Sequence, residues 1–144
     1  MTTLDLSNLP ILLVDDEAFI RSLVMRMLNE MGYQKITQAA DGVEASKALL
    51  SATPPIAAII LDLEMPNVGG FEFLKFVRNA QEVPNKKIPI VVLTGHSNRD
   101  NIIQAAKLGI HGFLVKPVSK TMLDKKLKHA LTAPMIDPAL IPNG

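Results

Sequence analysis

Four strand-like runs of apolar residues recur along this chain and constrain its fold more than any other feature. They cover residues 11–14, 57–61, 88–93 and 111–115. A strand with one face in water alternates apolar and polar side chains, whereas a strand buried on both faces of a parallel sheet is apolar nearly throughout. The first three runs do not alternate, so they predict a parallel sheet, with residues 35–39 as a weaker additional strand.

Amphipathic segments separate the predicted strands. After the first strand, apolar side chains recur at helical spacing from Phe19 to Met31, and Gly32 follows as a helix stop. Further helices are expected at about residues 43–50, 71–78, 98–108 and 119–131. Strands that alternate with helices predict an α/β fold, a doubly wound five-stranded parallel sheet of flavodoxin-like type with helices on both faces.

The chain length of 144 residues suits one domain. We expect a loosely held arm at residues 1–9, the domain at residues 10–131 and a tail at residues 132–144. The tail is punctuated by prolines and contains four large apolar residues, namely Met135, Ile136, Leu140 and Ile141. We expect it to pack on the last helix, with engagement of a partner as the alternative.

Composition excludes several classes of function. The sequence contains no cysteine, which rules out disulfides and thiol catalysis, and His96, His111 and His129 lack metal-binding spacing. No apolar run approaches the roughly 20 residues of a membrane span, and the first residues lack the basic region of a signal peptide. We therefore expect a cytoplasmic protein with no membrane partner. A formal net charge of +1 gives no overall nucleic-acid footprint.

Charge is unevenly distributed along the sequence. Residues 1–72 carry 10 acidic and 4 basic side chains, whereas residues 73–144 carry 4 acidic and 11 basic ones. The basic half could offer a surface to a partner, although a solvated charge bias explains the same pattern.

Polar residues with complementary chemistry end four of the predicted strands. Asp15 and Asp16 follow the first strand, Asp62 the third, Thr94 the fourth and Lys116 the fifth. The carboxyl ends of strands in a doubly wound sheet meet at one edge, so these side chains should converge. Three converging carboxylates repel one another unless a hard cation neutralises them, which predicts a site for Mg²⁺ or Mn²⁺.

Each member of this set also has an ordinary explanation. Asp62 could cap a turn, Asp16 could be the N-cap of the first helix, and Asp15 its solvated neighbour. Thr94 could be a common strand-end hydroxyl, and Lys116 a surface cation whose stem packs on the sheet. A functional site is favoured because four strand ends would otherwise have acquired complementary chemistry independently.

The sequence resembles the response-regulator receiver domain of two-component signalling, of the type seen in chemotaxis regulators. The resemblance spans about residues 10–131 and rests on motifs in order and at familiar spacing. They are Leu13-Val14-Asp15-Asp16, Leu61-Asp62-Leu63-Glu64-Met65-Pro66 with Gly70, Leu93-Thr94-Gly95, and Phe113-Leu114-Val115-Lys116-Pro117.

The resemblance implies a role for each site residue. Asp62 would be the phosphoacceptor, receiving the phosphoryl group from a histidine kinase or a histidine phosphotransfer protein. Asp16 would ligate the metal directly, Asp15 through water, and Glu64 through its main-chain carbonyl. Thr94 and Lys116 would compensate charge on the phosphoryl oxygens. The protein would be a single-domain regulator that phosphorylates and dephosphorylates itself, but not an enzyme in the usual sense.

The resemblance also implies a switch and a partner surface. Thr94 would move toward the phosphoryl group, and Phe113 would turn inward to fill the vacated space; the alternative is that Phe113 is a permanent core residue. An unidentified downstream protein would bind the fourth helix, fifth strand and fifth helix, where five lysines gather: Lys107, Lys120, Lys125, Lys126 and Lys128. The Lys116-Pro117 bond is expected to be cis, and the protein a monomer or weak dimer.

Two residues beside the site are expected to tune the lifetime of the phosphorylated state. Glu64 lies two residues after Asp62, and His96 two residues after Thr94. Both would flank the path by which water attacks an acyl phosphate, although Glu64 could either orient that water or repel it. Gly69 stands where many receivers have Asp, so a more flexible loop is expected there.

Three other functions compete with this interpretation. A Mg²⁺-dependent phosphohydrolase would place its nucleophile after the first strand in an Asp-x-Asp pattern, which this sequence lacks. A phosphorylation-independent scaffold would not need the full acidic set with Thr94 and Lys116. A flavin-binding domain would need hydrogen-bond donors where Asp15 and Asp16 stand.

Overall fold

The computed structural model describes residues 6–65, 69–95 and 99–141. Within these ranges strands and helices alternate as the sequence predicts. The elements are η1 (Leu6–Asn8), β1 (Ile11–Val14), α1 (Ala18–Glu30), β2 (Ile36–Ala39), α2 (Gly42–Ser51), β3 (Ala58–Asp62), α3 (Gly70–Asn79), β4 (Ile90–Thr94), α4 (Arg99–Leu108), β5 (Gly112–Val115), α5 (Lys120–Thr132) and η2 (Pro138–Leu140), where η denotes a 3₁₀ helix.

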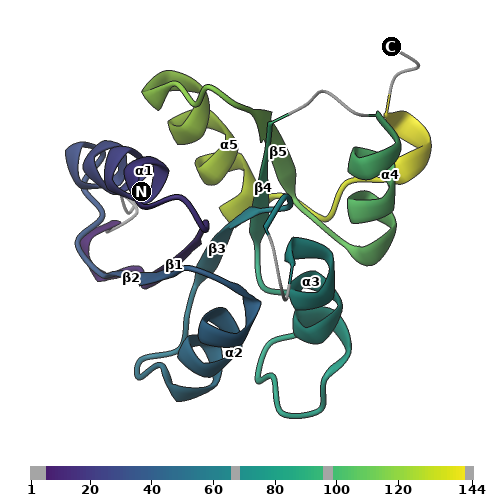
Figure 1. Ribbon diagram of the computed structural model, residues 1–144, viewed down its shortest axis with the longest axis horizontal. Coiled ribbons are helices and arrows are strands. Elements are labelled where there is room, and N and C mark those ends of the chain that lie inside the picture. Colours follow the sequence, from purple (N-terminus) through teal and green to yellow (C-terminus); the bar gives the residue numbers. More distant parts are fainter. Residues whose placement is uncertain (1–5, 66–68, 96–98, 142–144) are drawn as a thin grey trace.

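The five strands form one parallel sheet in the order β2-β1-β3-β4-β5. The order reverses between β1 and β3, and ligands of open α/β sheets bind at the carboxyl edge beside such a reversal. Helices α1 and α5 cover one face of the sheet, and α2, α3 and α4 cover the other (Figure 1). The predicted doubly wound, flavodoxin-like fold is confirmed.

The core lies on both faces of the sheet, because alternate side chains of each buried strand point to opposite sides. Leu12, Ile59 and Val92 belong to the cluster under α2, α3 and α4. Leu13 and Ile60 belong to the cluster under α1 and α5. All positions of β1, β3 and β4 are buried, which explains why these strands read as continuous apolar runs.

Two site residues end strands instead of following them. Asp62 is the last residue of β3, and Thr94 is the last residue of β4. The strand β4 begins at Ile90, two residues later than predicted, because Pro89 has no N–H to donate to a ladder. The N-cap of α1 is Glu17, so the alternative that Asp16 caps this helix is wrong.

Gly32 ends α1, as the sequence predicts. Its φ of +105° lies in the left-handed region that glycine adopts without strain. The N–H of Gly32 donates to Asn29 and that of Tyr33 to Leu28, which satisfies carbonyls at the end of the helix. The chain can then turn sharply toward β2.

The N-terminal arm is better anchored than expected. Leu6 and Leu9, which flank η1, pack against the core cluster under α1 and α5. The expectation of a loosely held arm is therefore wrong for these two residues. Of the helices that the structure describes, none is both long and apolar enough to cross a membrane.

Candidate functional site

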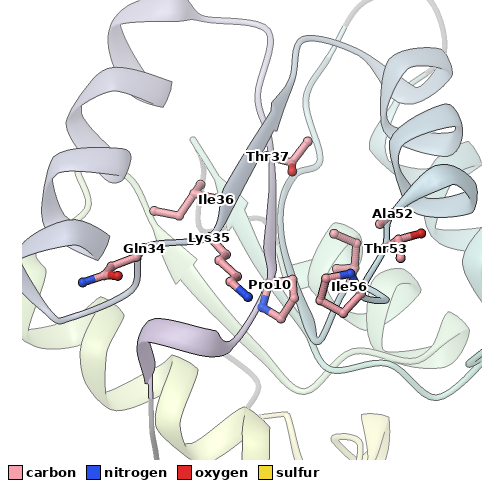
Figure 2. Close-up of a pocket in the computed structure, with 9 residues that line it drawn as sticks. Pro10, Gln34, Lys35, Ile36, Thr37, Ala52, Thr53 and Ile56 are labelled. Atoms are coloured by element: carbon pink, nitrogen blue, oxygen red, sulfur yellow. The ribbon is translucent and has the colours of Figure 1, made fainter.

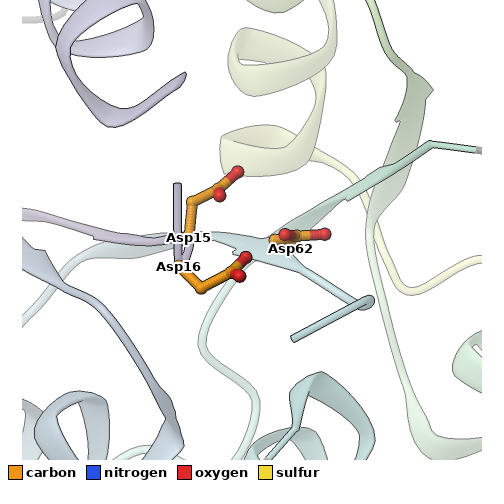
Figure 3. Close-up of side chains that lie close together, drawn as sticks. All are labelled: Asp15, Asp16 and Asp62. Atoms are coloured by element: carbon orange, nitrogen blue, oxygen red, sulfur yellow. The ribbon is translucent and has the colours of Figure 1, made fainter. Parts of the chain in front are cut away.

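Three carboxylates meet at the carboxyl edge of the sheet, where the sequence predicts them. Asp15 follows β1, Asp16 comes next, and Asp62 ends the neighbouring strand β3. One oxygen from each lies within 4.8 Å of the other two, and Figure 3 shows the three side chains close together at the strand ends. Asp15 and Asp62 are buried, with exposed fractions of 0% and 1%, whereas Asp16 is exposed.

Lys116 provides the positive charge between the two buried carboxylates. Its Nζ lies 3.2 Å from Asp15 Oδ2 and 3.3 Å from Asp62 Oδ2. Glu17 Oε1 is 3.6 Å from the same ammonium. The Lys116-Pro117 peptide bond is cis, as predicted. Lys116 directly follows β5, and its main-chain N–H donates to the carbonyl of Thr94, which places the residue beside the end of β4.

Burial changes the acidity of the central carboxyl group. Desolvation raises the pKa of Asp62 to about 7, and the nearby charge of Asp15 acts in the same direction. The N–H of Glu64, which donates to Asp62 Oδ1 at 3.0 Å, and the Lys116 ammonium oppose this rise. For Lys116, burial lowers the pKa, but the charges of Asp62 and Asp15 outweigh it, so that its pKa is raised. The site therefore holds more negative charge than its one lysine compensates.

The side chain of Glu64 occupies the donors on the β4 side of the site. Its Oε1 accepts a hydrogen bond from Thr94 Oγ1 at 2.8 Å, and its Oε2 accepts one from the N–H of Gly95 at 2.6 Å. The Thr94 hydroxyl and the Gly95 N–H therefore form a pair of hydrogen-bond donors that binds an anionic group. One of these two donors, the Thr94 hydroxyl, is the group that was predicted to bind a phosphoryl group.

Two residues of the site were not found from the sequence. Arg21, on the first helix, donates from its Nη1 to the main-chain carbonyl of Asp15 at 2.6 Å. Glu17 is the third acidic group within reach of Lys116. The signal for Arg21 was its place one turn into a helix that follows an acidic pair, from which a long side chain can reach back.

The glycine after the acidic loop is required by close packing. A Cβ on Gly70 would lie 2.5 Å from the carbonyl oxygen of Asp62 and 2.6 Å from Leu63 Cα. Gly70 has no positive φ, so its role is to let α3 begin against β3. The N–H of Gly69 donates to Glu72 Oε2 at 2.7 Å, which secures the start of α3. Pro66 lies outside the described residues, as does His96.

The expected switch aromatic and the lysines lie beside the site. Phe113 on β5 is half-buried, and Lys126 Nζ stands 5.7 Å from the centre of its ring. Lys120 pairs with Glu30 and Lys128 with Asp124, whereas Lys107 and Lys125 are exposed. Part of the predicted basic surface is therefore neutralised by acidic neighbours.

A cavity at the opposite end of the sheet does not contribute to this site. It has a volume of about 440 Å³ and lies where β1 and β2 begin and α2 ends, lined by Pro10, Ile36 and Thr53 among others (Figure 2). Lys35 is its one charged lining residue. The converging carboxylates and Lys116 lie at the other end of the sheet, at its carboxyl edge.

Comparison with known families identifies the arrangement. Residues 11–128 match the response regulator receiver domain, which covers most of the chain and includes all five site positions. The chain belongs to this family. The resemblance predicted from the sequence motifs is thereby confirmed, and Asp15, Asp62, Thr94 and Lys116 stand at the edge of a receiver.

Relatives of this receiver include chemotaxis regulators. It is 32% identical over 120 residues to the chemotaxis protein CheY-3 of Vibrio cholerae, covering 83% of this chain and 89% of that protein. It is also 32% identical over 121 residues to the chemotaxis protein CheY1 of Helicobacter pylori, covering 84% and 95% respectively. Such receivers are regulators and not classical enzymes.

Solved structures agree with this placement. The chemotaxis response regulator CheY4 of Vibrio cholerae superposes with a TM-score of 0.76 at 36% identity, covering 85% of this chain and 98% of that one. A response regulator receiver domain protein from Clostridium thermocellum gives a TM-score of 0.76 at 27% identity, covering 85% and 94%.

Proposed function

We propose that this protein is a single-domain response regulator whose Asp62 accepts a phosphoryl group. The observation that carries the proposal is the convergence on Asp62 of two further carboxylates and the Lys116 ammonium. Asp62 Oδ2 is buried, and among the described residues its polar neighbour is the Lys116 ammonium, 3.3 Å away. This oxygen therefore faces the cation that would offset charge during transfer, while Oδ1 accepts a hydrogen bond from the N–H of Glu64.

The donor set fits a hard divalent cation. Asp15, Asp16 and Asp62 offer only oxygen ligands, and in the described part of the chain the buried Asp15 Oδ2 and Asp62 Oδ2 have no polar partner besides the Lys116 ammonium that they share. Mg²⁺ or Mn²⁺ prefers such ligands and retains several waters. These three residues, with the main-chain carbonyl of Glu64, would hold the ion. When bound, it would compensate charge on the phosphoryl oxygens.

Each residue of the site has a distinct part in the proposed transfer. A carboxylate oxygen of Asp62 forms a bond to phosphorus as the bond from phosphorus to the donor nitrogen or oxygen breaks, and the donor leaves with that electron pair. The Lys116 ammonium offsets negative charge beside the reacting oxygen. Thr94 can donate its hydroxyl to the new phosphoryl group after releasing Glu64. Glu64 thereby competes with the product for a hydrogen-bond donor.

The phosphodonor is proposed to be a histidine kinase or a histidine phosphotransfer protein. Phe19, one turn after the acidic pair, is 77% exposed, and so large an exposed aromatic beside a reactive site suits protein contact. Its neighbour Ala18 is exposed too, so the first turn of α1 offers an apolar surface near Asp16. A cytoplasmic location is consistent with such a donor.

Phosphorylation is proposed to change the binding of a downstream protein at α4, β5 and α5. Thr94 ends β4, and Phe113 lies on the adjacent strand β5 in register with Val92, two residues before Thr94. Moving Thr94 toward Asp62 would change the packing next to the half-buried Phe113 ring. The exposed apolar side chains of Val115 and Met122 and the ammonium of Lys125 would contribute to the partner surface.

Phosphorylation of the protein in Mg²⁺ by acetyl phosphate tests the proposal. Intact-mass measurement should show the gain of one phosphoryl group, and its loss over time without another protein. Asp62→Asn is the matched control, because it keeps the shape of the side chain and should gain no mass. If the wild-type protein gains no mass and binds no beryllofluoride, Asp62 is not a phosphoacceptor.

A further inference from the structure

The segment that follows α5 does not continue along that helix. It crosses the start of β5 and reaches α4, where η2 lies beside the helix (Figure 1). The N–H of Ile136 donates to the carbonyl of Ile110 at 2.8 Å. The expectation that the tail packs on the last helix is therefore wrong, because its main contacts lie on the other side of the sheet edge.

Apolar packing holds this segment at two points. Ile136 and Ile141 pack against the core cluster that contains Ile110 and two alanines of α4, and Phe113 packs against the same cluster. A Cβ placed on Gly109, which follows α4, would lie 2.9 Å from Met135 Sδ. The tail thus fills the space at the end of α4, on the side of the sheet to which Phe113 belongs.

The contact is limited to these points. A cavity of about 410 Å³ separates part of the tail from the domain and is lined by Lys87, His111 and Pro134 among others. Leu140, in η2, is 77% exposed. In the described part of the tail, one main-chain hydrogen bond to the domain and a few partly buried side chains hold the segment, which gives it the modest stability expected of an element that opens locally.

We propose that residues 134–141 brace α4 against the start of β5 while Thr94 is bound to Glu64, and that formation of the phosphorylated state releases this brace. The inference rests on the proposed function of Asp62. Its physical basis is that the tail lies against α4 and against Ile110, which connects α4 to β5, so a rearrangement of α4 and β5 removes contacts on which the tail depends. The tail stabilises the unphosphorylated arrangement of α4 and β5 and thereby opposes the change to the phosphorylated arrangement.

Binding of beryllofluoride in Mg²⁺ measures this restraint in the full chain. Ile136→Ala should strengthen binding about fivefold, as expected if roughly half of the burial of one isoleucine is lost on switching. Leu140→Ala is the matched control, because it changes an exposed side chain in the same segment, and it should bind like the wild type. Equal affinity for Ile136→Ala and Leu140→Ala would overturn the brace.

Hydrogen exchange of the wild-type protein gives a test that needs no variant. The Ile136 amide should be protected without beryllofluoride, because it donates to Ile110, and should exchange at least tenfold faster once beryllofluoride is bound. Unchanged protection in the bound state would contradict the release of the tail. Failure of the wild type to bind beryllofluoride at all would instead overturn the phosphoacceptor role, and the brace with it.

Discussion

Removal of the Glu64 carboxylate should make phosphorylation of Asp62 faster. Glu64 accepts hydrogen bonds from Thr94 and from the N–H of Gly95, at 2.8 Å and 2.6 Å. A phosphoryl group that takes the Thr94 hydroxyl must first break one of these bonds. The Glu64 side chain is exposed, so water weakens both bonds, and a competition cost of about 1.5 kcal/mol is the lower end of the range for bonds to a charged group.

This cost sets the size of the expected effect. About 1.4 kcal/mol corresponds to a factor of ten, so Glu64→Ala should raise the initial rate of phosphorylation by acetyl phosphate about tenfold. Glu64→Gln keeps one acceptor oxygen but loses the charge, and should raise the rate about threefold. Both substitutions retain the main-chain N–H that binds Asp62 Oδ1.

The assay is a time course of intact mass in saturating Mg²⁺, with the rate taken before dephosphorylation contributes. Glu82→Gln is the control, because it removes the same charge from an exposed side chain far from the site. The reasoning is refuted if Glu64→Ala lies within twofold of the wild type or is slower. A fast Glu64→Gln with a slow Glu64→Ala would show that Glu64 assists transfer as a hydrogen-bond acceptor.

Three further predictions follow from the buried groups. Gly70→Ala should cost about 1–3 kcal/mol of unfolding free energy and slow phosphorylation, because its Cβ would meet the main chain at Asp62; urea denaturation and the mass assay check this. Lys116→Met should lower stability in metal-free buffer at pH 8 by about 3–5 kcal/mol, because two buried carboxylates lose their cation, and added Mg²⁺ should restore part of it. Burial, with the charge of Arg78 as a lesser cause, lowers the pKa of His111 to about 4. The stability that neutral His111 supports is therefore present above pH 6.5 and lost as the pH falls toward 4, by about 3 kcal/mol, whereas His111→Gln should lack this loss in urea titrations at several pH values.

The sheet and the carboxylates of its edge could be predicted because both follow from local patterns. A strand buried on two faces must be apolar, so β1, β3 and β4 can be recognised as apolar runs in the sequence. The polar residue at the end of each run then lies at the same edge of the sheet. Asp15, Asp62 and Lys116 were found this way, and the structure brings them together.

The remaining details depend on distant contacts that no local pattern encodes. The carboxylate of Glu64 is exposed, and its choice of Thr94 as donor depends on the spacing of β3 and β4. The position of the tail could not be predicted, because its isoleucines would pack on any apolar surface. The surface on which they do pack, at α4, is defined only by the folded domain. Gly70 is required by the proximity of α3 to β3, which the residues around it in the sequence do not reveal.

The site residues come from widely separated segments of the sequence, so the site depends on folding of the whole domain. Asp15 and Lys116 come from near opposite ends of the domain, and they meet Asp62 only after β1, β3, β4 and β5 have aligned in one parallel sheet. Parallel pairing of strands that are distant in the sequence is intrinsically slow, because the loops between them must close first. A nascent or partly degraded chain should therefore lack the proposed acceptor site, and the ability to take up a phosphoryl group should report that the whole domain is folded. Only fully folded molecules of this protein would then take part in signalling.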